Sequence, residues 1–215
     1  MLWIDLVFNL LIVLSTVLAV CAFFFTGPDA LGSTGVQSFR YFTTDSNILA
    51  AAAAAVMAAQ DLRALRGGTG LSRAALCFKL VGTVSVSVTL VTVVCFLVPM
   101  SGGNGLAFFR GNTFALHLST PLLAIVSFLV LEQGEPLRFR VIFPALIPTV
   151  LYSAVYAYMV IGTGRWFDWY GFTFGGRYAL APAAVLAMYV LTFVLAWAEW
   201  WLRRRLMSRK QKQAA

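Results

Sequence analysis

A threonine, a histidine and a tyrosine lie in three different apolar segments of this 215-residue chain. They are Thr43, Tyr156 and His117, the single histidine of the sequence. Polar side chains inside such segments are costly and often have a function. A neutral imidazole takes the proton of a hydroxyl as the oxygen attacks a carbonyl carbon, and later returns it to the leaving group. These residue types therefore suggest acyl transfer, with Thr43 as the nucleophile and His117 as the general base.

The four residues after Thr43 are also polar and are candidates for substrate binding: Thr44, Asp45, Ser46 and Asn47. Thr43 and Thr44 point about 100° apart on a helix, so only one of them is expected to face His117. Ser46 is a reserve nucleophile, and the Asn47 amide could hold the substrate carbonyl group.

Two tyrosines and two aspartates complete the candidate site. The hydroxyl groups of Tyr152 and Tyr156, one helical turn apart, could stabilise a developing oxyanion. The carboxylate of Asp45 or Asp168 could orient the imidazole, which would give an arrangement similar to a catalytic triad. No metal or other cofactor is required by this chemistry.

The same residues also have a purely structural interpretation. A lone histidine in a membrane often only hydrogen-bonds a neighbouring helix. Thr43 and Thr44 can cap a helix or bond to its carbonyl groups. Asp5 and Asn9 share one face near the start of the first apolar segment, across the membrane from His117, and we interpret them as structural.

Composition restricts the class of protein. Hydrophobic residues make up 60% of the chain, charged residues only 11%, against about 25% in soluble domains. This excludes a soluble enzyme and intrinsic disorder, and it indicates lipid as the solvent. A single histidine excludes a histidine-rich zinc site and a bis-histidine haem. The three cysteines lie in apolar runs and are expected to be buried and unpaired.

Turn residues divide the chain into apolar segments long enough to cross a membrane as helices. We expect six helices, at 2–25, 39–60, 75–98, 112–131, 141–161 and 178–202. The expected fold is an all-α polytopic membrane protein, with a six-helix transmembrane domain at 1–202 and a basic tail at 203–215. A rise of 1.5 Å per residue places Thr43 about 6 Å and His117 about 7 Å inside their helices, in one layer with Tyr156.

Basic residues predict the orientation of the helices. Six helices put both termini on one side, which carries twelve of the 16 basic residues, six of them in the tail. Cytoplasmic loops carry this excess, so both termini are expected in the cytoplasm of a bacterial-type plasma-membrane protein. The net charge of +8 then reflects topology and contact of the tail with anionic lipid, and no nucleic-acid partner is expected.

The segment Phe39-Arg-Tyr-Phe-Thr43-Thr-Asp-Ser-Asn47 resembles the "FRYFT…SN" motif of a bacterial family of predicted six-transmembrane proteins. His117, followed by Pro121, is similar to the "LH…P" helix of that family. The family is distantly similar to the androgen-induced and androgen-dependent membrane proteins of animals. Those are threonine hydrolases that cleave fatty acid esters of hydroxy fatty acids. The resemblance implies that Thr43 and His117 are catalytic.

The sequence analysis thus predicts an intramembrane threonine hydrolase that acts on a lipid ester among the membrane lipids. One alternative is a small transporter or channel for a lipid or another solute, and another is a non-enzymatic assembly partner. A transporter requires polar groups through the cytoplasmic half of the helices as well. We expect few ionisable residues there, which favours the enzyme.

Overall fold

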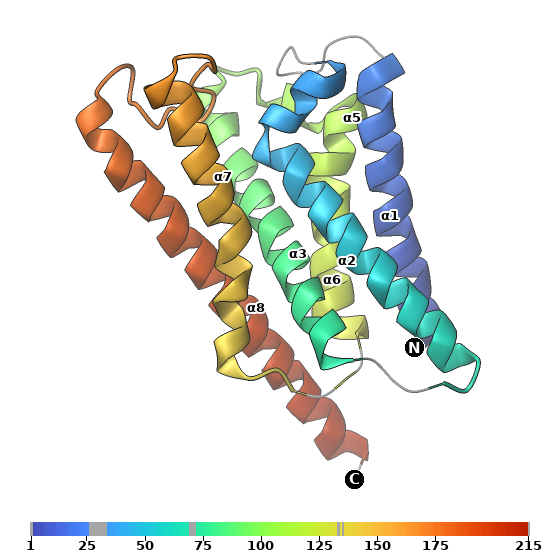
Figure 1. The fold of residues 1–215 in the computed structure, drawn as a ribbon. Helices are drawn as coiled ribbons and strands as arrows, with labels where there is room; N and C mark the ends of the chain where they lie inside the picture. The colour runs from blue at the N-terminus through green and yellow to red at the C-terminus, as the bar shows by residue number, and fades with distance from the viewer. Residues whose placement is uncertain (1, 26–33, 69–71, 133, 135, 215) are drawn as a thin grey trace.

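The computed structural model describes residues 2–25, 34–68, 72–132, 134 and 136–214. Six helical segments in these ranges are long and apolar enough to cross a membrane, which confirms the predicted all-helical fold with six spans. The spans are Leu2–Phe25, Phe42–Leu65, Arg73–Met100, Gly111–Leu131, Phe139–Gly162 and Tyr178–Arg209. Both chain ends lie at the lower end of the bundle in Figure 1, called the terminal end below. The other end is called the opposite end.

Four of the spans are built from more than one kind of helix. The elements in chain order are α1 (Leu2–Phe25), η1 (Gly35–Arg40), α2 (Phe42–Leu65), α3 (Arg73–Thr92), η2 (Val93–Leu97), α4 (Val98–Met100), η3 (Gly105–Phe109), α5 (Gly111–Phe114), η4 (Ala115–Ser119), α6 (Thr120–Val126), η5 (Ser127–Leu131), η6 (Phe139–Ile142), η7 (Pro144–Leu146), α7 (Ile147–Ala157), η8 (Tyr158–Gly162), η9 (Tyr178–Leu180) and α8 (Ala181–Ala214). Elements η2, η4, η5 and η8 are wide π turns. Two of them precede a proline, Pro99 and Pro121, which has no N–H for the regular helical hydrogen bond.

Close packing of small residues joins α2 to α3 in the centre of the bundle. The alanine tract of α2 lies against Gly82 of α3, where an added Cβ atom would come within 2.9 Å of the Ala50 Cα atom. Such small residues let two backbones approach in a membrane. The span containing α3 is 56% buried, whereas the span of α8 is only 17% buried. α3 is therefore the central helix, and α8 lies at the edge of the bundle (Figure 1).

Several predicted boundaries differ from the structure by one to seven residues, and two of these differences affect the candidate site and the tail. The second span begins as an α-helix at Phe42, not at residue 39, because Tyr41 is extended (φ −103°, ψ 133°) and ends the preceding 3₁₀ helix. Thr43 is therefore the second residue of α2, and the predicted depth of about 6 Å inside this helix is wrong. The last helix shows no break at residue 202, since α8 continues to Ala214.

Candidate functional site

A cavity of about 520 Å³ lies at the opposite end of the bundle. Its walls come from α3, η2, α7 and α8, from the first residues of α2, and from the loop between the fifth and sixth spans. Most of the lining is apolar, and among the lining residues are Val88, Phe96, Phe172, Ala187 and Leu191. A mostly apolar cavity of this size, with a few polar groups, is typical of a small-molecule site.

Thr43 is the candidate nucleophile that lines this cavity. Its carbonyl oxygen accepts hydrogen bonds from Ser46 and Asn47, but its hydroxyl has no hydrogen bond to another described group. Thr92 lines the same cavity, and its hydroxyl is buried without a partner. Two residues that line the cavity thus carry a hydroxyl group without a hydrogen bond to a described protein group.

The residues after Thr43 have different surroundings. Thr44 is buried at 1% exposure and does not line the cavity, whereas Asp45 is exposed beside a second hollow of about 640 Å³ between α2 and α7. The Ser46 hydroxyl lies 2.8 Å from the Thr89 hydroxyl of α3. Ser46 therefore joins two helices, and its hydroxyl is already hydrogen-bonded.

Asn47 connects α2 to the fourth span. Its Nδ2 atom donates to the carbonyl oxygens of Thr43 at 2.7 Å and Leu116 at 3.0 Å. Both amide hydrogens are used in this way, so in this arrangement Asn47 holds two helices together and has no hydrogen left for a substrate carbonyl. Its Oδ1 atom is buried without a partner.

His117 is buried in the π turn η4, at 1% exposure. Its Nδ1 atom lies 2.7 Å from the carbonyl oxygen of Phe108. A carbonyl oxygen can only accept, so Nδ1 carries a proton and Nε2 is the basic nitrogen of the neutral ring. Neither Thr43 nor Thr44 forms a hydrogen bond with His117 in the part of the chain that the structure describes.

The imidazole is oriented by a backbone group, not by one of the two expected aspartates. Asp45 and Asp168 form no hydrogen bond or ion pair with His117 among the described residues, so the expectation that one of them orients the ring is wrong. The Phe108 carbonyl oxygen occupies that position at Nδ1. A backbone acceptor can fix the ring and its tautomer as a carboxylate does.

Asp168 instead organises the loop at 163–177 between the fifth and sixth spans, which lines the cavity and is called the aromatic loop below. Its carboxylate accepts hydrogen bonds from the Tyr156 hydroxyl at 2.9 Å, the Phe172 N–H at 2.9 Å, and the Thr173 N–H and hydroxyl, both at 2.7 Å. Burial raises the pKa of Asp168, but these hydrogen bonds outweigh it and hold the pKa below its usual value. The loop is therefore fixed by one ionised carboxylate.

The two tyrosines of α7 use their hydroxyl hydrogens within the protein. Tyr152 lines the cavity and donates to the Arg40 carbonyl oxygen at 2.7 Å, while Tyr156 donates to Asp168. Tyr170 of the loop accepts from the Phe42 N–H at 3.2 Å, and burial raises its pKa to about 12. These contacts attach the loop to the start of α2, and the expected oxyanion donors are already committed.

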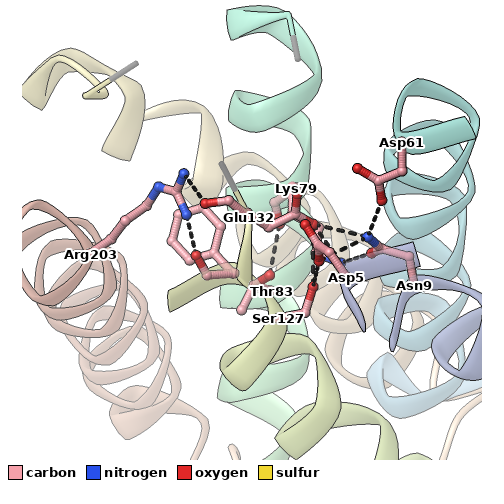
Figure 2. Close-up of polar contacts among 9 residues, drawn as sticks. Asp5, Asn9, Asp61, Lys79, Thr83, Ser127, Glu132 and Arg203 are labelled. Carbon is pink, nitrogen blue, oxygen red and sulfur yellow. Dashed lines mark hydrogen bonds and ion pairs between the residues drawn. The ribbon is translucent and has the colours of Figure 1, made fainter. Parts of the chain in front are cut away.

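A second polar site, at the terminal end, was not expected from the sequence. Figure 2 shows side chains from α1, α2, α3, the end of the fourth span and α8 that meet in the interior. We call this set the terminal-end cluster: Asp5, Asn9, Asp61, Lys79, Ser127, Glu132 and Arg203. The expectation that few ionisable residues occupy this half of the bundle is wrong. The one available signal was the spacing of Asp5 and Asn9, which we interpreted as structural.

No protein-family model, curated protein or solved structure matches the chain. The geometry of the cavity and of the terminal-end cluster therefore carries the functional argument.

Proposed function

We propose that the protein is an intramembrane hydrolase of lipid esters, with Thr43 as its nucleophile. The observation that carries the proposal is that Thr43 lines an apolar cavity of about 520 Å³ and that its hydroxyl has no hydrogen bond to a described protein group. An acyl chain would occupy the cavity. The ester group of the lipid would lie at the start of α2, next to Thr43.

The proposed reaction is acyl transfer to Thr43 followed by hydrolysis. The Thr43 oxygen attacks the ester carbonyl carbon, its proton passes to a base, and the alcohol leaves with that proton. Water then attacks the acyl-threonine, which releases the fatty acid and restores the hydroxyl. The N-terminal end of α2 favours negative charge, so the oxyanion would form beside a favourable helix dipole.

His117 is the proposed base. The hydrogen bond from Nδ1 to the Phe108 carbonyl leaves Nε2 as the basic nitrogen of the neutral ring. Asn47 ties the start of α2 to Leu116, the neighbour of His117, so the two helices meet at this level. Catalytic hydrogen bonds often tighten only with substrate, and the proposal requires Thr43 and His117 to approach each other when a lipid is bound.

We further propose that both termini are cytoplasmic and that the membrane is a bacterial plasma membrane. The excess of basic residues at the terminal end supports this orientation. At this end the guanidinium groups of Arg204 and Arg205 stack over Trp200 and Trp201, at 5.6 and 4.6 Å from the ring centroids. Aromatic and basic side chains together are typical of a membrane interface, and the tail would contact anionic lipid there.

Covalent labelling tests the nucleophile. Purified protein is treated with an alkyl fluorophosphonate, and the labelled peptide is mapped by mass spectrometry. We expect the adduct on Thr43, complete loss of labelling in Thr43→Ala, and labelling near the wild-type level in the matched control Thr44→Ala. Thr43→Ser should retain labelling. An adduct on Ser46 or Thr44, or equal labelling of Thr43→Ala and wild type, would disprove the assignment.

Transport of a lipid or small solute is the second candidate function. The terminal-end cluster favours it, because ionisable side chains inside the membrane often mark a path for ions or substrates. Reconstituted liposomes distinguish the two functions. A transporter would move labelled lipid across the bilayer equally well in wild type and Thr43→Ala, whereas a hydrolase would release fatty acid in wild type alone.

A further inference from the structure

The terminal-end cluster is removed from solvent and from lipid. Asp5, Asn9, Asp61 and Glu132 are 0% exposed, and Lys79 is 1% exposed. These residues come from the first three spans and, for Glu132, from the residue directly after the fourth span, and α8 adds Arg203. Buried charges of this kind are stable only when they are paired and hydrogen-bonded.

The charges of the cluster do not balance. Three carboxyl groups face two cations, so full ionisation leaves one negative charge in the interior. Lys79 forms an ion pair with Glu132 at 3.5 Å, and Arg203 donates to the carbonyl oxygens of Phe128 and Glu132. Among the described residues, Asp5 and Asp61 form no ion pair. One bound proton would bring the cluster to neutrality.

The hydrogen bonds also show a shortage of donors. The Asn9 Nδ2 atom has two hydrogens but lies 3.2–3.3 Å from oxygens of three carboxyl groups, those of Asp5, Asp61 and Glu132. The Ser127 Oγ atom lies 3.2 Å from a carboxyl oxygen of Asp5 and 3.2 Å from one of Glu132, but it has a single hydrogen to donate. Each of the three carboxyl groups keeps one buried oxygen without any partner. A protonated carboxyl group would supply a missing donor.

We infer that the terminal-end cluster is a proton-binding site, with one exchangeable proton shared by Asp5 and Glu132. These two residues accept from the same pair of donors, Asn9 and Ser127, and therefore lie side by side. The charged groups around them are Asp61 on α2, Lys79 on α3 and Arg203 on α8 (Figure 2). The proton comes from water, and its release leaves the cluster with one uncompensated negative charge.

A proton fits the site better than a metal ion. In the described ranges, no three His, Cys, Asp or Glu side chains are placed so that they could hold a metal. The Lys79 ammonium group already lies between Asn9 and Glu132, where a cation would have to bind. This inference is independent of the proposed hydrolase, because the cluster lies at the other end of the bundle.

Infrared spectroscopy tests the inference through the C=O stretching band of a protonated carboxyl group. Glu199 is a further buried carboxyl group outside the cluster and accepts a hydrogen bond from Ser87 at 2.6 Å. All samples therefore carry Glu199→Gln, which removes its signal. At neutral pH we expect one protonated carboxyl band in this background. Adding Asp5→Asn should remove it, because two carboxylates then balance two cations.

Two further variants keep the test decisive. Lys79→Met removes a cation, so a second carboxyl group should bind a proton and the band should grow to about twice its intensity. Asp45 is exposed, and the control variant Asp45→Asn should leave the band unchanged. If Asp5→Asn does not fold, Glu132→Gln carries the same expectation. A background sample without the band, or a band that Asp5→Asn and Glu132→Gln leave intact, would overturn the inference. A band that appears only after sodium is removed would assign the site to a sodium ion and overturn it as well.

Discussion

Asn47 of α2 donates a hydrogen bond of 3.0 Å to the carbonyl oxygen of Leu116, the residue directly before His117. The same amide nitrogen holds the Thr43 carbonyl oxygen at 2.7 Å. One side chain thus sets the position of both candidate catalytic residues. The two carbonyl groups would be left without this donor if the amide were removed.

The first prediction concerns this amide. Asn47→Leu should lower the free energy of unfolding by about 1–3 kcal/mol, since the Leu116 carbonyl oxygen loses its side-chain donor and the Thr43 carbonyl oxygen keeps only that of Ser46. The measurement is thermal or denaturant unfolding in detergent. Ile48→Val, one residue further and partly exposed, is the control and should change stability little. Equal stability of Asn47→Leu and wild type would show that the hydrogen bonds from Asn47 to Thr43 and Leu116 do not stabilise the fold.

The second prediction concerns His117. His117→Ala should abolish ester hydrolysis while the protein remains folded and inserted, because the sequence holds no second imidazole. Turnover of a chromogenic ester and circular dichroism are measured on the same sample. Normal turnover in the variant would make His117 a structural residue.

The third prediction concerns Asp168 and pH. The pKa of Asp168 is lower in the folded protein than in the unfolded chain, where it is about 4. The ionised carboxylate therefore stabilises the aromatic loop fully at pH values above about 4. This stabilisation is lost as the pH falls through the pKa of the folded protein. Tryptophan fluorescence from Trp166 and Trp169 should therefore be constant from pH 5 to 8 and change only in the acid range. Asp168→Asn should show the acid-like signal already at neutral pH; Asp45→Asn is the control.

The fourth prediction concerns topology. The native cysteines Cys21, Cys77 and Cys95 are free, and Cys21 and Cys95 are exposed, so their expected burial is wrong. All three are first replaced by alanine. Single cysteines at Asn104 and Phe167 should then react with a membrane-impermeant maleimide in intact cells. Cysteines at Arg66 and Ser208 should react only after the membrane is opened. Labelling of Ser208→Cys in intact cells would reverse the orientation.

Most of the fold could be predicted because hydropathy and turn residues report directly on membrane spans. The sequence predicts all six spans, and the predicted ends differ from the structure by seven residues at most, at the end of the sixth span. One of these differences changes the position of a candidate site residue. Tyr41 has an extended backbone, so α2 begins at Phe42 and Thr43 is its second residue. At this boundary the Phe42 N–H donates a hydrogen bond to the hydroxyl of Tyr170, which lies far along the chain, and local sequence patterns do not report such a contact.

The terminal-end cluster could not be predicted for a related reason. Lys79 is one of the twelve basic residues on the side of the termini, yet α3 begins at Arg73 and carries Lys79 about two turns into the helix, where it is 1% exposed. Glu132 directly follows the fourth span, and Arg203 lies within α8, six residues before the end of the sixth span. Their meeting depends on how each helix is rotated about its axis, and sequence spacing alone does not fix this rotation.

The π turns have a consequence for the alignment of related chains. A π turn hydrogen-bonds from residue i to i+5, so it contains one residue more than the α-helical turn it replaces. The fourth span holds two of them, one on each side of α6. A homologue with a regular helix there would need a one-residue gap on each side of Pro121. An ungapped alignment would pair His117 with a neighbouring position and hide an equivalent histidine.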